Sequence, residues 1–292
     1  LNVGKLLNRL QEYDAAQRHL NKALDTKEKI HGESSPQLVE VLTELGASTV
    51  HTKRASVAAN HLIRAAGLSS LDENPAHEAA IHLRAGLTLV RLDRDNQAAP
   101  LLARAQSLFS AEFGELDVRG ALAGMQLGRI HLDRGEFVDA KDVLEATVPA
   151  FAPPDMSEYA LSSRKLLVEV YERLGQRDAA TVHCVEYAKL KARDGSGFPE
   201  RIFQGQPSSS NRFQSNRQAI GGASGRVIVQ FIIDERGFVT DPEVMDSTEK
   251  RVEREAVDYV KAQRYAPKIV DGVPVKAYFR FSYGQSHRIR SY

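Results

Sequence analysis

The chain has 292 residues, of which 42% are hydrophobic and 26% are charged, a composition typical of folded domains that excludes a wholly disordered chain. Its 39 Lys and Arg residues balance 38 Asp and Glu residues, which argues against a dedicated nucleic-acid binder. A single cysteine excludes an intramolecular disulfide and a cysteine-rich metal site.

The start of the sequence carries neither a run of 18 apolar residues nor a recognisable signal peptide, so it predicts no membrane-spanning segment. Leu1 already lies inside the repeat described next. We therefore interpret the sequence as a fragment whose N-terminus is missing, and in that case the lack of a targeting signal excludes no compartment.

A repeat of 40 to 42 residues fills residues 1–191. Each unit has a glycine, an alanine twelve residues later and a leucine four residues after that; these are Gly4, Gly46, Gly86 and Gly128, then Ala16, Ala58, Ala98 and Ala140, then Leu20, Leu62, Leu102 and Leu144. A fifth unit keeps Ala180 but has Val168 and Cys184 at the glycine and leucine positions. Apolar residues at helical spacing, separated by turn residues, predict two antiparallel helices in each unit.

The set Leu45-Gly46, Ala58, Leu62 and Ala65 resembles the tetratricopeptide repeat, and the period of about 42 residues is similar to the variety found in kinesin light chains. The resemblance implies an all-α solenoid over residues 1–192 with about five helix pairs, the first of them truncated.

In that family, ligands bind in a groove lined by the first helix of each pair. Register places six basic or imidazole side chains there, namely Lys5, Arg9, His51, Arg91, Arg129 and Arg173. Two interpretations stay open: a mildly basic groove for an acidic or C-terminal peptide, or an ordinary solvated face, because Asp133, Glu169 and Glu172 interrupt the basic track.

Residues 193–224 are rich in Gly, Pro and Ser and show no periodicity, so they predict a linker. Apolar residues such as Ile202 and Phe203 could still dock on the end of the solenoid. The stretch Gly222–Gly225 has the pattern neither of a phosphate-binding loop nor of a nucleophile elbow.

From Gly225 the apolar period becomes two. Val227–Ile233 reads as a strand, Asp234–Gly237 as a hairpin turn, Phe238–Ser247 as a partner strand with an edge or bulge at Pro242, Glu249–Gln263 as a helix and Val275–Tyr283 as a last strand. The fold class is therefore α+β, in which an all-α solenoid precedes a small β-β-α-β domain over residues 225–292.

The ordered motifs of this segment resemble the C-terminal domain of TonB-type proteins. The motifs are Gly225 to Phe231, Asp234 to Gly237, Val239-Thr240, Glu255-Ala256-Val257, Arg264-Tyr265-Ala266-Pro267 and Asp271 to Val275. Two features depart from the family: Gln263 stands where Trp is usual, and no Pro-x-Tyr-Pro segment precedes Gly225.

This resemblance implies a periplasmic domain of Gram-negative bacteria that takes a short peptide of an outer-membrane receptor as an added strand and transmits force to it. The candidate edge is the last strand, with Val275, Lys276, Ala277, Tyr278, Phe279, Arg280 and Phe281 as its partner-binding residues. The outward Lys276 and Arg280 either tune the choice of partner or protect the edge from aggregation.

The sequence predicts no enzyme, no catalytic residue, no metal site and no cofactor. His77 and His82 are five residues apart, whereas a zinc site of that type needs histidines four apart on one helix face. Cys184 occupies a core position of the fifth unit and is expected to be a buried, inert thiol.

We therefore expect a periplasmic adaptor that binds proteins or peptides, such as an outer-membrane receptor segment or other envelope proteins, and no nucleic acid. An uncleaved N-terminal helix would anchor it in the inner membrane. The alternative is a repeat scaffold whose C-terminal domain mediates homodimerisation or docks on the solenoid without energy transduction.

Overall fold

The computed structural model describes residues 1–51, 54–71, 73–151, 157–193, 195, 199–206, 226–248 and 250–283. The chain forms two compact units, Leu1–Ala152 and Pro153–Tyr292, which are described one at a time. No helix among the described residues is both long enough and apolar enough to cross a lipid bilayer.

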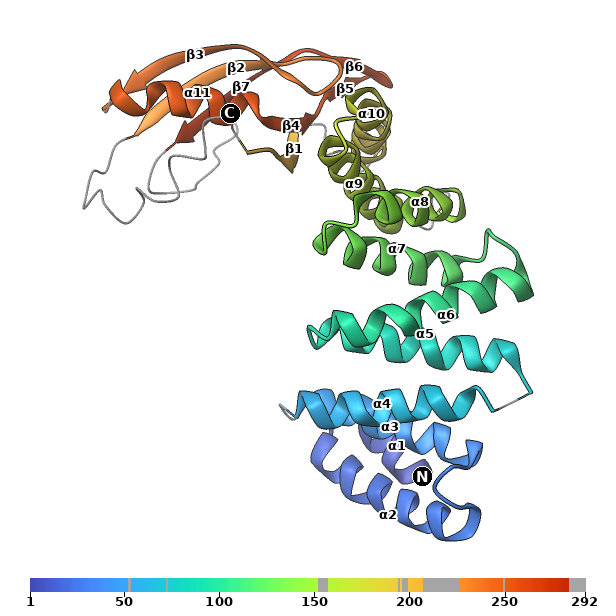
Figure 1. Cartoon of the computed structure of the whole chain (residues 1–292). Coiled ribbons are helices and arrows are strands. Elements are labelled where there is room, and N and C mark those ends of the chain that lie inside the picture. The colour runs from blue at the N-terminus through green and yellow to red at the C-terminus, as the bar shows by residue number, and fades with distance from the viewer. Residues whose placement is uncertain are drawn as a thin grey trace. The chain divides into compact units, whose positions relative to one another are not determined.

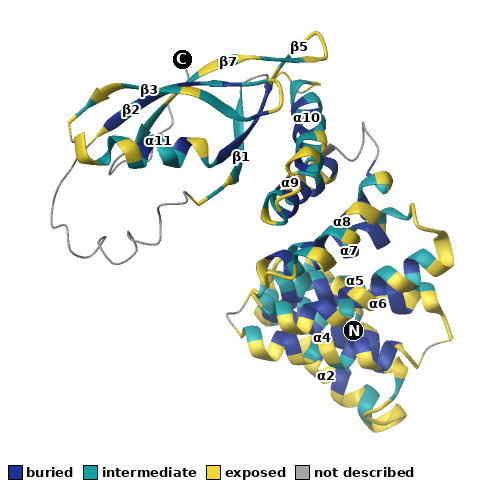
Figure 2. Ribbon diagram, turned by 45° about the horizontal axis from the view of Figure 1, so that its top comes forward, coloured by how far each residue is buried: buried dark blue, intermediate teal, exposed yellow. Residues whose placement is uncertain are grey.

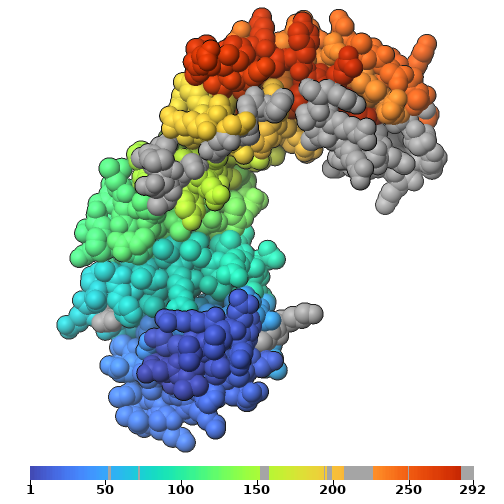
Figure 3. All heavy atoms as spheres, turned by 180° about the vertical axis from the view of Figure 1, so that it is seen from behind, coloured from blue at the N-terminus to red at the C-terminus, as the bar shows by residue number. Residues whose placement is uncertain are grey.

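The unit Leu1–Ala152 is a stack of four helix pairs (Figure 1). The helices are α1 (Asn2–Arg9), α2 (Tyr13–His31), α3 (Val39–Val50), α4 (Ala55–Ser69), α5 (Pro75–Arg91), α6 (Asp95–Phe113), α7 (Val118–Asp133) and α8 (Phe137–Thr147), with short 3-10 turns at Pro36–Leu38 and Val148–Ala150. Each helix packs against the next along the chain, and the first helices α1, α3, α5 and α7 also contact one another in order. In the space-filling view the pairs of this unit follow each other as successive bands of colour (Figure 3).

Local sequence signals set several helix ends. The side chain of Asn74 accepts a hydrogen bond from the backbone N–H of His77 at the start of α5, and Asp117 accepts bonds from the N–H groups of Arg119 and Gly120 at the start of α7. Helices α2 and α6 both end at a glycine with positive φ, 83° at Gly32 and 90° at Gly114.

The repeated glycine and leucine of each pair lock together, which explains their spacing. A Cβ atom placed on Gly4, Gly46, Gly86 or Gly128 would come within 2.5 to 2.7 Å of a side-chain carbon of Leu20, Leu62, Leu102 or Leu144, respectively. Glycine at this position therefore lets the leucine of the second helix fill the space where a side chain would lie. We call this contact the glycine–leucine interlock.

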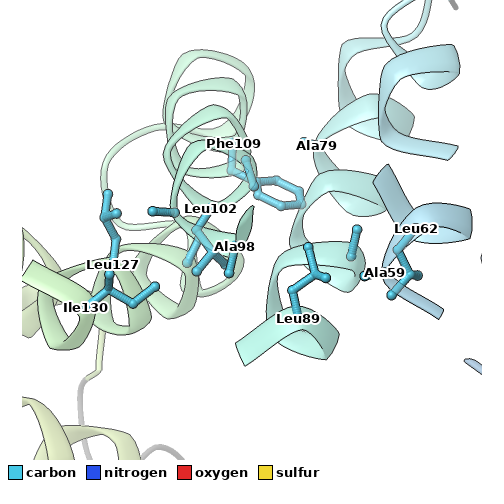
Figure 4. Close-up of a cluster of buried hydrophobic side chains, with 13 residues drawn as sticks. Ala59, Leu62, Ala79, Leu89, Ala98, Leu102, Phe109, Leu127 and Ile130 are labelled. Atoms are coloured by element: carbon cyan, nitrogen blue, oxygen red, sulfur yellow. The ribbon is translucent and has the colours of Figure 1, made fainter. Parts of the chain in front are cut away.

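Between the pairs, buried alanines and leucines form two apolar clusters, one within residues 16–81 and one within residues 59–130. Figure 4 shows Leu62, Leu89, Leu102 and Phe109 with several alanines filling the space between neighbouring helices, and Figure 2 shows the buried residues along the facing sides of these helices. The predicted all-α solenoid with tetratricopeptide-like pairs is thus confirmed for this unit.

The unit Pro153–Tyr292 begins with the fifth helix pair, α9 (Ser157–Arg173) and α10 (Arg177–Arg193). Here Val168 and Cys184 replace the glycine and the leucine, and both are fully buried in one cluster. The residue on the first helix is thus larger, and the residue on the second helix smaller, than in the other four pairs.

The rest of this unit is built from β1 (Glu200–Gln204), β2 (Val227–Ile233), β3 (Val239–Ser247), a 3-10 turn (Lys250–Val252), α11 (Glu253–Lys261), β4 (Gln263–Ala266), β5 (Lys268–Val270), β6 (Val273–Val275) and β7 (Ala277–Tyr283). An antiparallel sheet has the order β3-β2-β7, while β1 pairs with β4 and β5 pairs with β6. Val227, Val229, Phe231 and Ile233 of β2 pack on Ala256 and Val260 of α11. The predicted β-β-α-β order is confirmed, with β4, β5 and β6 inserted before the last strand.

Three details differ from the sequence-based expectation. The predicted linker contains β1, because Ile202 buries itself beside Val168 and Ala266. The predicted last strand is interrupted at Lys276, where β6 ends and β7 begins. The fifth helix pair, which we assigned to the solenoid, belongs by its contacts to the same compact unit as the C-terminal domain. Residues 207–225, with Gly222–Gly225, lie outside the described residues.

Candidate functional site

Strand β7 lies at one end of the sheet order β3-β2-β7. Its pairing with β2 is regular over its whole length, from Val227 opposite Tyr283 to Ile233 opposite Ala277. No described strand pairs with its other side. The outer main chain of β7 is therefore an edge along which another strand can add.

The opposite edge, β3, is irregular. Its register with β2 shifts twice, it contains Pro242, and Asp241 has a φ of 48°. Bulges and prolines of this kind hinder the addition of a strand. The regular edge of the sheet is thus the one that the sequence analysis selected.

The side chains of β7 alternate between the core and the surface, as expected. The ring of Phe279 lies 5.7 Å from that of Phe231 and 5.5 Å from that of Tyr265, while Phe281 stacks on Tyr259 of α11. On the outer face Tyr278 is 77% exposed, and Nε of Arg280 donates to the amide oxygen of Gln230 at 2.8 Å.

The predicted edge residues do not all lie on this strand. Ala277, Tyr278, Phe279, Arg280 and Phe281 belong to β7, but Val275 pairs with Lys268 in the hairpin of β5 and β6, and Lys276 links the two elements. The change of partner at Lys276 ends the hairpin and starts the sheet strand, which an uninterrupted alternation in sequence does not reveal.

Strand β4 lies between two layers of unit Pro153–Tyr292. Gln263 stands where the family usually has Trp; it is 3% exposed, and its amide group donates to the carbonyl oxygens of Tyr259 at 2.7 Å and of Gly205 at 3.3 Å. The amide nitrogen thus ties α11 to the end of β1, while the buried amide oxygen has no hydrogen-bond partner among the described residues.

Arg264 of β4 is 1% exposed and reaches the fifth helix pair. Its Nη1 donates to Glu172 Oε1 of α9 at 2.7 Å, its Nη2 donates to the hydroxyl oxygen of Thr181 in α10, and its guanidinium lies 3.6 Å from the ring centroid of Phe238. The Glu172 side chain is only 8% exposed, so the ion pair is buried. Sequence analysis missed this contact and treated Glu172 as an interruption of the groove.

Cys184 lies beside this ion pair. It is fully buried, its S–H donates to the carbonyl oxygen of Tyr265 at 3.1 Å, and burial raises the pKa of the thiol to about 11. The thiol is therefore protonated near neutral pH and a poor nucleophile, which agrees with the expectation of an inert core residue.

The six residues assigned to the solenoid groove lie on first helices or at their ends, but several already have partners. Lys5 pairs with Glu40; Arg129 pairs with Asp133 at 2.6 Å and with Asp95 at 3.2 Å; Arg173 pairs with Glu169 at 3.3 Å; and His51 stacks on Tyr13 at 4.0 Å. Arg9 and Arg91 are exposed. Half of the predicted basic track is thus paired with acidic side chains of the chain itself.

A polar cluster occupies the space between α4, α5 and α6. Glu78 is 5% exposed and accepts bonds from Arg104 at 2.9 and 3.3 Å and from Ser70 at 3.0 Å. Burial opposes ionisation of Glu78, but these hydrogen bonds outweigh it and lower its pKa. His82 and Ser69 lie nearby, and the fully buried Ser69 hydroxyl donates to the Ala66 carbonyl oxygen.

One group of potential metal ligands occurs among the described residues. Ligand atoms of His131, Glu136 and Asp139 lie within 4.8 Å of one another, and His131 Nδ1 is 2.5 Å from a Glu136 oxygen. The contact joins the end of α7 to the start of α8 across the turn at Gly135, so a hydrogen bond that closes the turn accounts for it.

Comparisons with known proteins agree with a chain that has a helical repeat region and a separate type of C-terminal domain. Residues 216–284 match the family model described as Gram-negative bacterial TonB protein C-terminal. No curated protein sequence matches the chain.

Solved helical-repeat structures share the fold of the larger part of the chain. The crystal structure of BtubC (BKLC) from P. vanneervenii has 16% identity and a TM-score of 0.54, with 68% of this chain and 80% of that chain covered. A kinesin light chain with nearly identical TPR-like repeats from Podosopora anserina has 15% identity and a TM-score of 0.53, with 66% and 93% covered. At such identities the likeness shows the fold alone. The chain therefore combines a tetratricopeptide-like repeat region with a C-terminal domain of the TonB type.

Proposed function

We propose that this chain is a protein-binding component of the Gram-negative cell envelope whose C-terminal domain captures an extended peptide as a strand added to β7. The observation that carries the proposal is the asymmetry of the sheet, in which β7 is a regular edge and β3 is not. Main-chain hydrogen bonds would supply affinity, and the outward Tyr278 and Arg280 would select side chains of the partner. The match to the TonB family supports the periplasm as the compartment and outer-membrane receptor segments as ligands.

Amide hydrogen exchange on the full chain tests the proposal, with peptides from the periplasmic segments of outer-membrane receptors as ligands. We expect new protection in residues 277–283 and none in residues 239–247, the opposite edge. Protection of β3, or of neither edge, would contradict it. Arg280→Glu should weaken capture of an acidic peptide, whereas Arg226→Glu, which alters an exposed arginine paired with Asp246, should not.

The same edge supports homodimerisation as the second function, because two β7 strands can pair antiparallel around a twofold axis. Sedimentation equilibrium distinguishes peptide capture from homodimerisation. A dimer that dissociates when receptor peptide is added would indicate that both use the β7 edge, whereas a monomer at all concentrations would exclude homodimerisation and leave peptide capture as the function.

For the repeat region we propose that the face formed by the first helix of each pair, which we call the first-helix face, binds acidic peptides. Since Arg129 is bound by Asp95 and Asp133 while Arg91 is exposed, Arg91→Glu should weaken capture more than Arg129→Glu. Equal effects, or none, would favour an ordinary solvated face.

A further inference from the structure

The four residues of β4 are all buried, although successive side chains of a strand point to opposite faces. A strand of this kind needs a packed layer on each side. Tyr265 belongs to the core of the sheet and α11, whereas Ala266 belongs to the cluster of Val168, Cys184 and Tyr187. The second layer over β4 is therefore the fifth helix pair.

The contact between these layers is specific because it contains a buried charge. Arg264 would be costly to bury without the carboxylate of Glu172, and its Nε has no hydrogen-bond partner among the described residues. Its planar group stacks on Phe238 as well, so position and orientation are both defined.

The turn between β2 and β3 also contacts the region where β4 meets α10. Gly237 has a φ of 85°, and a Cβ there would collide with the carbonyl oxygen of Tyr265 and come within 2.8 Å of Cys184 Sγ. The neighbouring Arg236 forms an ion pair with Asp178 of α10. The turn therefore closes over β4 only because this residue is glycine.

We propose that α9 and α10 are an obligatory layer of the C-terminal domain rather than the last pair of an independent solenoid, and that Arg264, held by Glu172, is the positioning residue that keeps β4 on this layer. Helix α10 contacts β4, β5 and β6 in turn, and β7 follows directly. The path of the chain into the edge strand thus begins on the helix pair. The proposal does not depend on strand addition and stands or falls separately from it.

The only cysteine of the chain provides the test, because Cys184 lies in the contact and is fully buried. In the full-length chain under native conditions, the rate of alkylation by iodoacetamide reports how often α10 and β4 separate. We expect Glu172→Gln to raise this rate by about tenfold or more, since it leaves Arg264 without its counter-charge.

The matched control is Glu169→Gln, three residues earlier on α9, where the carboxylate is partly exposed and pairs with Arg173. We expect its rate to stay within about twofold of the original. Arg264→Lys keeps the positive charge but loses the planar guanidinium, which donates two hydrogen bonds and lies on the Phe238 ring. Its alkylation rate should lie between those of Glu172→Gln and the unchanged chain. If Glu172→Gln does not fold, Phe238→Leu keeps the ion pair of Arg264, removes the ring that lies against the guanidinium groups of Arg264 and Arg236, and should raise the alkylation rate a few-fold.

Amide exchange distinguishes positioning from general destabilisation. In the unchanged chain, residues 263–266 and 181–188 should lose protection together, and in Glu172→Gln both should exchange faster while α5 and α6 are unaffected. The proposal is overturned if β4 exchanges independently of α10, or if Glu172→Gln behaves like Glu169→Gln.

Discussion

The first four helix pairs and the fifth share one spacing but are held by different chemistry. In the first four, glycine and leucine interlock across each pair, and the space between pairs is filled by alanine and leucine. In the fifth pair, Val168 and Cys184 replace the glycine and the leucine. One side of this pair faces β4, where Glu172 and Thr181 accept hydrogen bonds from Arg264. The comparison shows that a repeat can keep its backbone register while its outer contacts change from apolar packing to a buried ion pair.

The two kinds of contact differ in what they contribute. Apolar interlocks stabilise through burial and dispersion, and they are repeated with little variation. A buried ion pair often contributes little net stability compared with apolar residues of similar size, yet removal of one partner is strongly destabilising. The fifth pair thus accepts only a partner that supplies the matching charge.

The largest expected effect comes from breaking this ion pair. Arg264→Met removes the buried counter-charge of Glu172, which then keeps only the exposed Arg177 at 3.9 Å, and should lower the free energy of unfolding of Pro153–Tyr292 by about 3–5 kcal/mol, measured by amide exchange under denaturant. The double variant Arg264→Met, Glu172→Leu should return most of the loss. If the double variant were as unstable as the single one, the ion pair would not be the reason for the loss.

The interlock should respond to an added methyl group by a smaller amount. Gly86→Ala places a Cβ 2.7 Å from Leu102 and should cost about 1–3 kcal/mol in thermal or urea unfolding. Gly67→Ala is the matched control, because no atom lies within 4 Å of a Cβ at that position in α4; the higher helix propensity of alanine should there stabilise the chain by up to about 1 kcal/mol.

The arrangement of the fifth pair can also be transferred into the third. Gly86→Val should be more destabilising than Gly86→Ala, and adding Leu102→Cys should recover part of the loss because it restores the Val–Cys combination of α9 and α10. If the effects of Gly86→Val and Leu102→Cys on the free energy of unfolding simply add, the occurrence of a larger residue on α9 with a smaller one on α10 is coincidental.

Acid should weaken the repeat through His82. Burial lowers the pKa of His82 below its ordinary 6.5, so the unfolded chain takes up a proton at this group before the folded chain does, and stability falls as the pH drops through 6.5. The contribution of one group is at most about 1.4 kcal/mol per pH unit. His82→Gln should flatten the dependence of unfolding free energy on pH between 6.5 and 5, measured by urea unfolding at a series of pH values.

The smallest effect is expected on the first-helix face. Arg129 is 30% exposed, so loss of its pairs with Asp95 and Asp133 in Arg129→Gln should cost less than about 1 kcal/mol in urea unfolding. A larger loss would show that this face depends on its charges as β4 does.

Sequence alone predicts the contacts that lie close along the chain. Glycine and leucine of one pair are 16 residues apart, as at Gly46 and Leu62, and period-two alternation marks β2 and β7. It does not predict Arg264 with Glu172, which are 92 residues apart, because nothing local distinguishes a glutamate that meets a distant arginine from one that meets water. For the same reason the sequence predicts a linker where β1 lies, since its partner β4 lies about 60 residues downstream.

The interlock also determines where the chain can change in length. The distance from glycine to leucine stays at 16 residues, but the distance from that leucine to the next glycine is 26 from Leu20, 24 from Leu62 and 26 from Leu102. The difference is taken up at the far end of the second helix, which has 19 residues in α2 and α6 and 15 in α4. Insertions are thus absorbed after Gly32 or Gly114, away from the interlock, and those turns are the natural places to graft an epitope or a fluorescent tag without disturbing the stack.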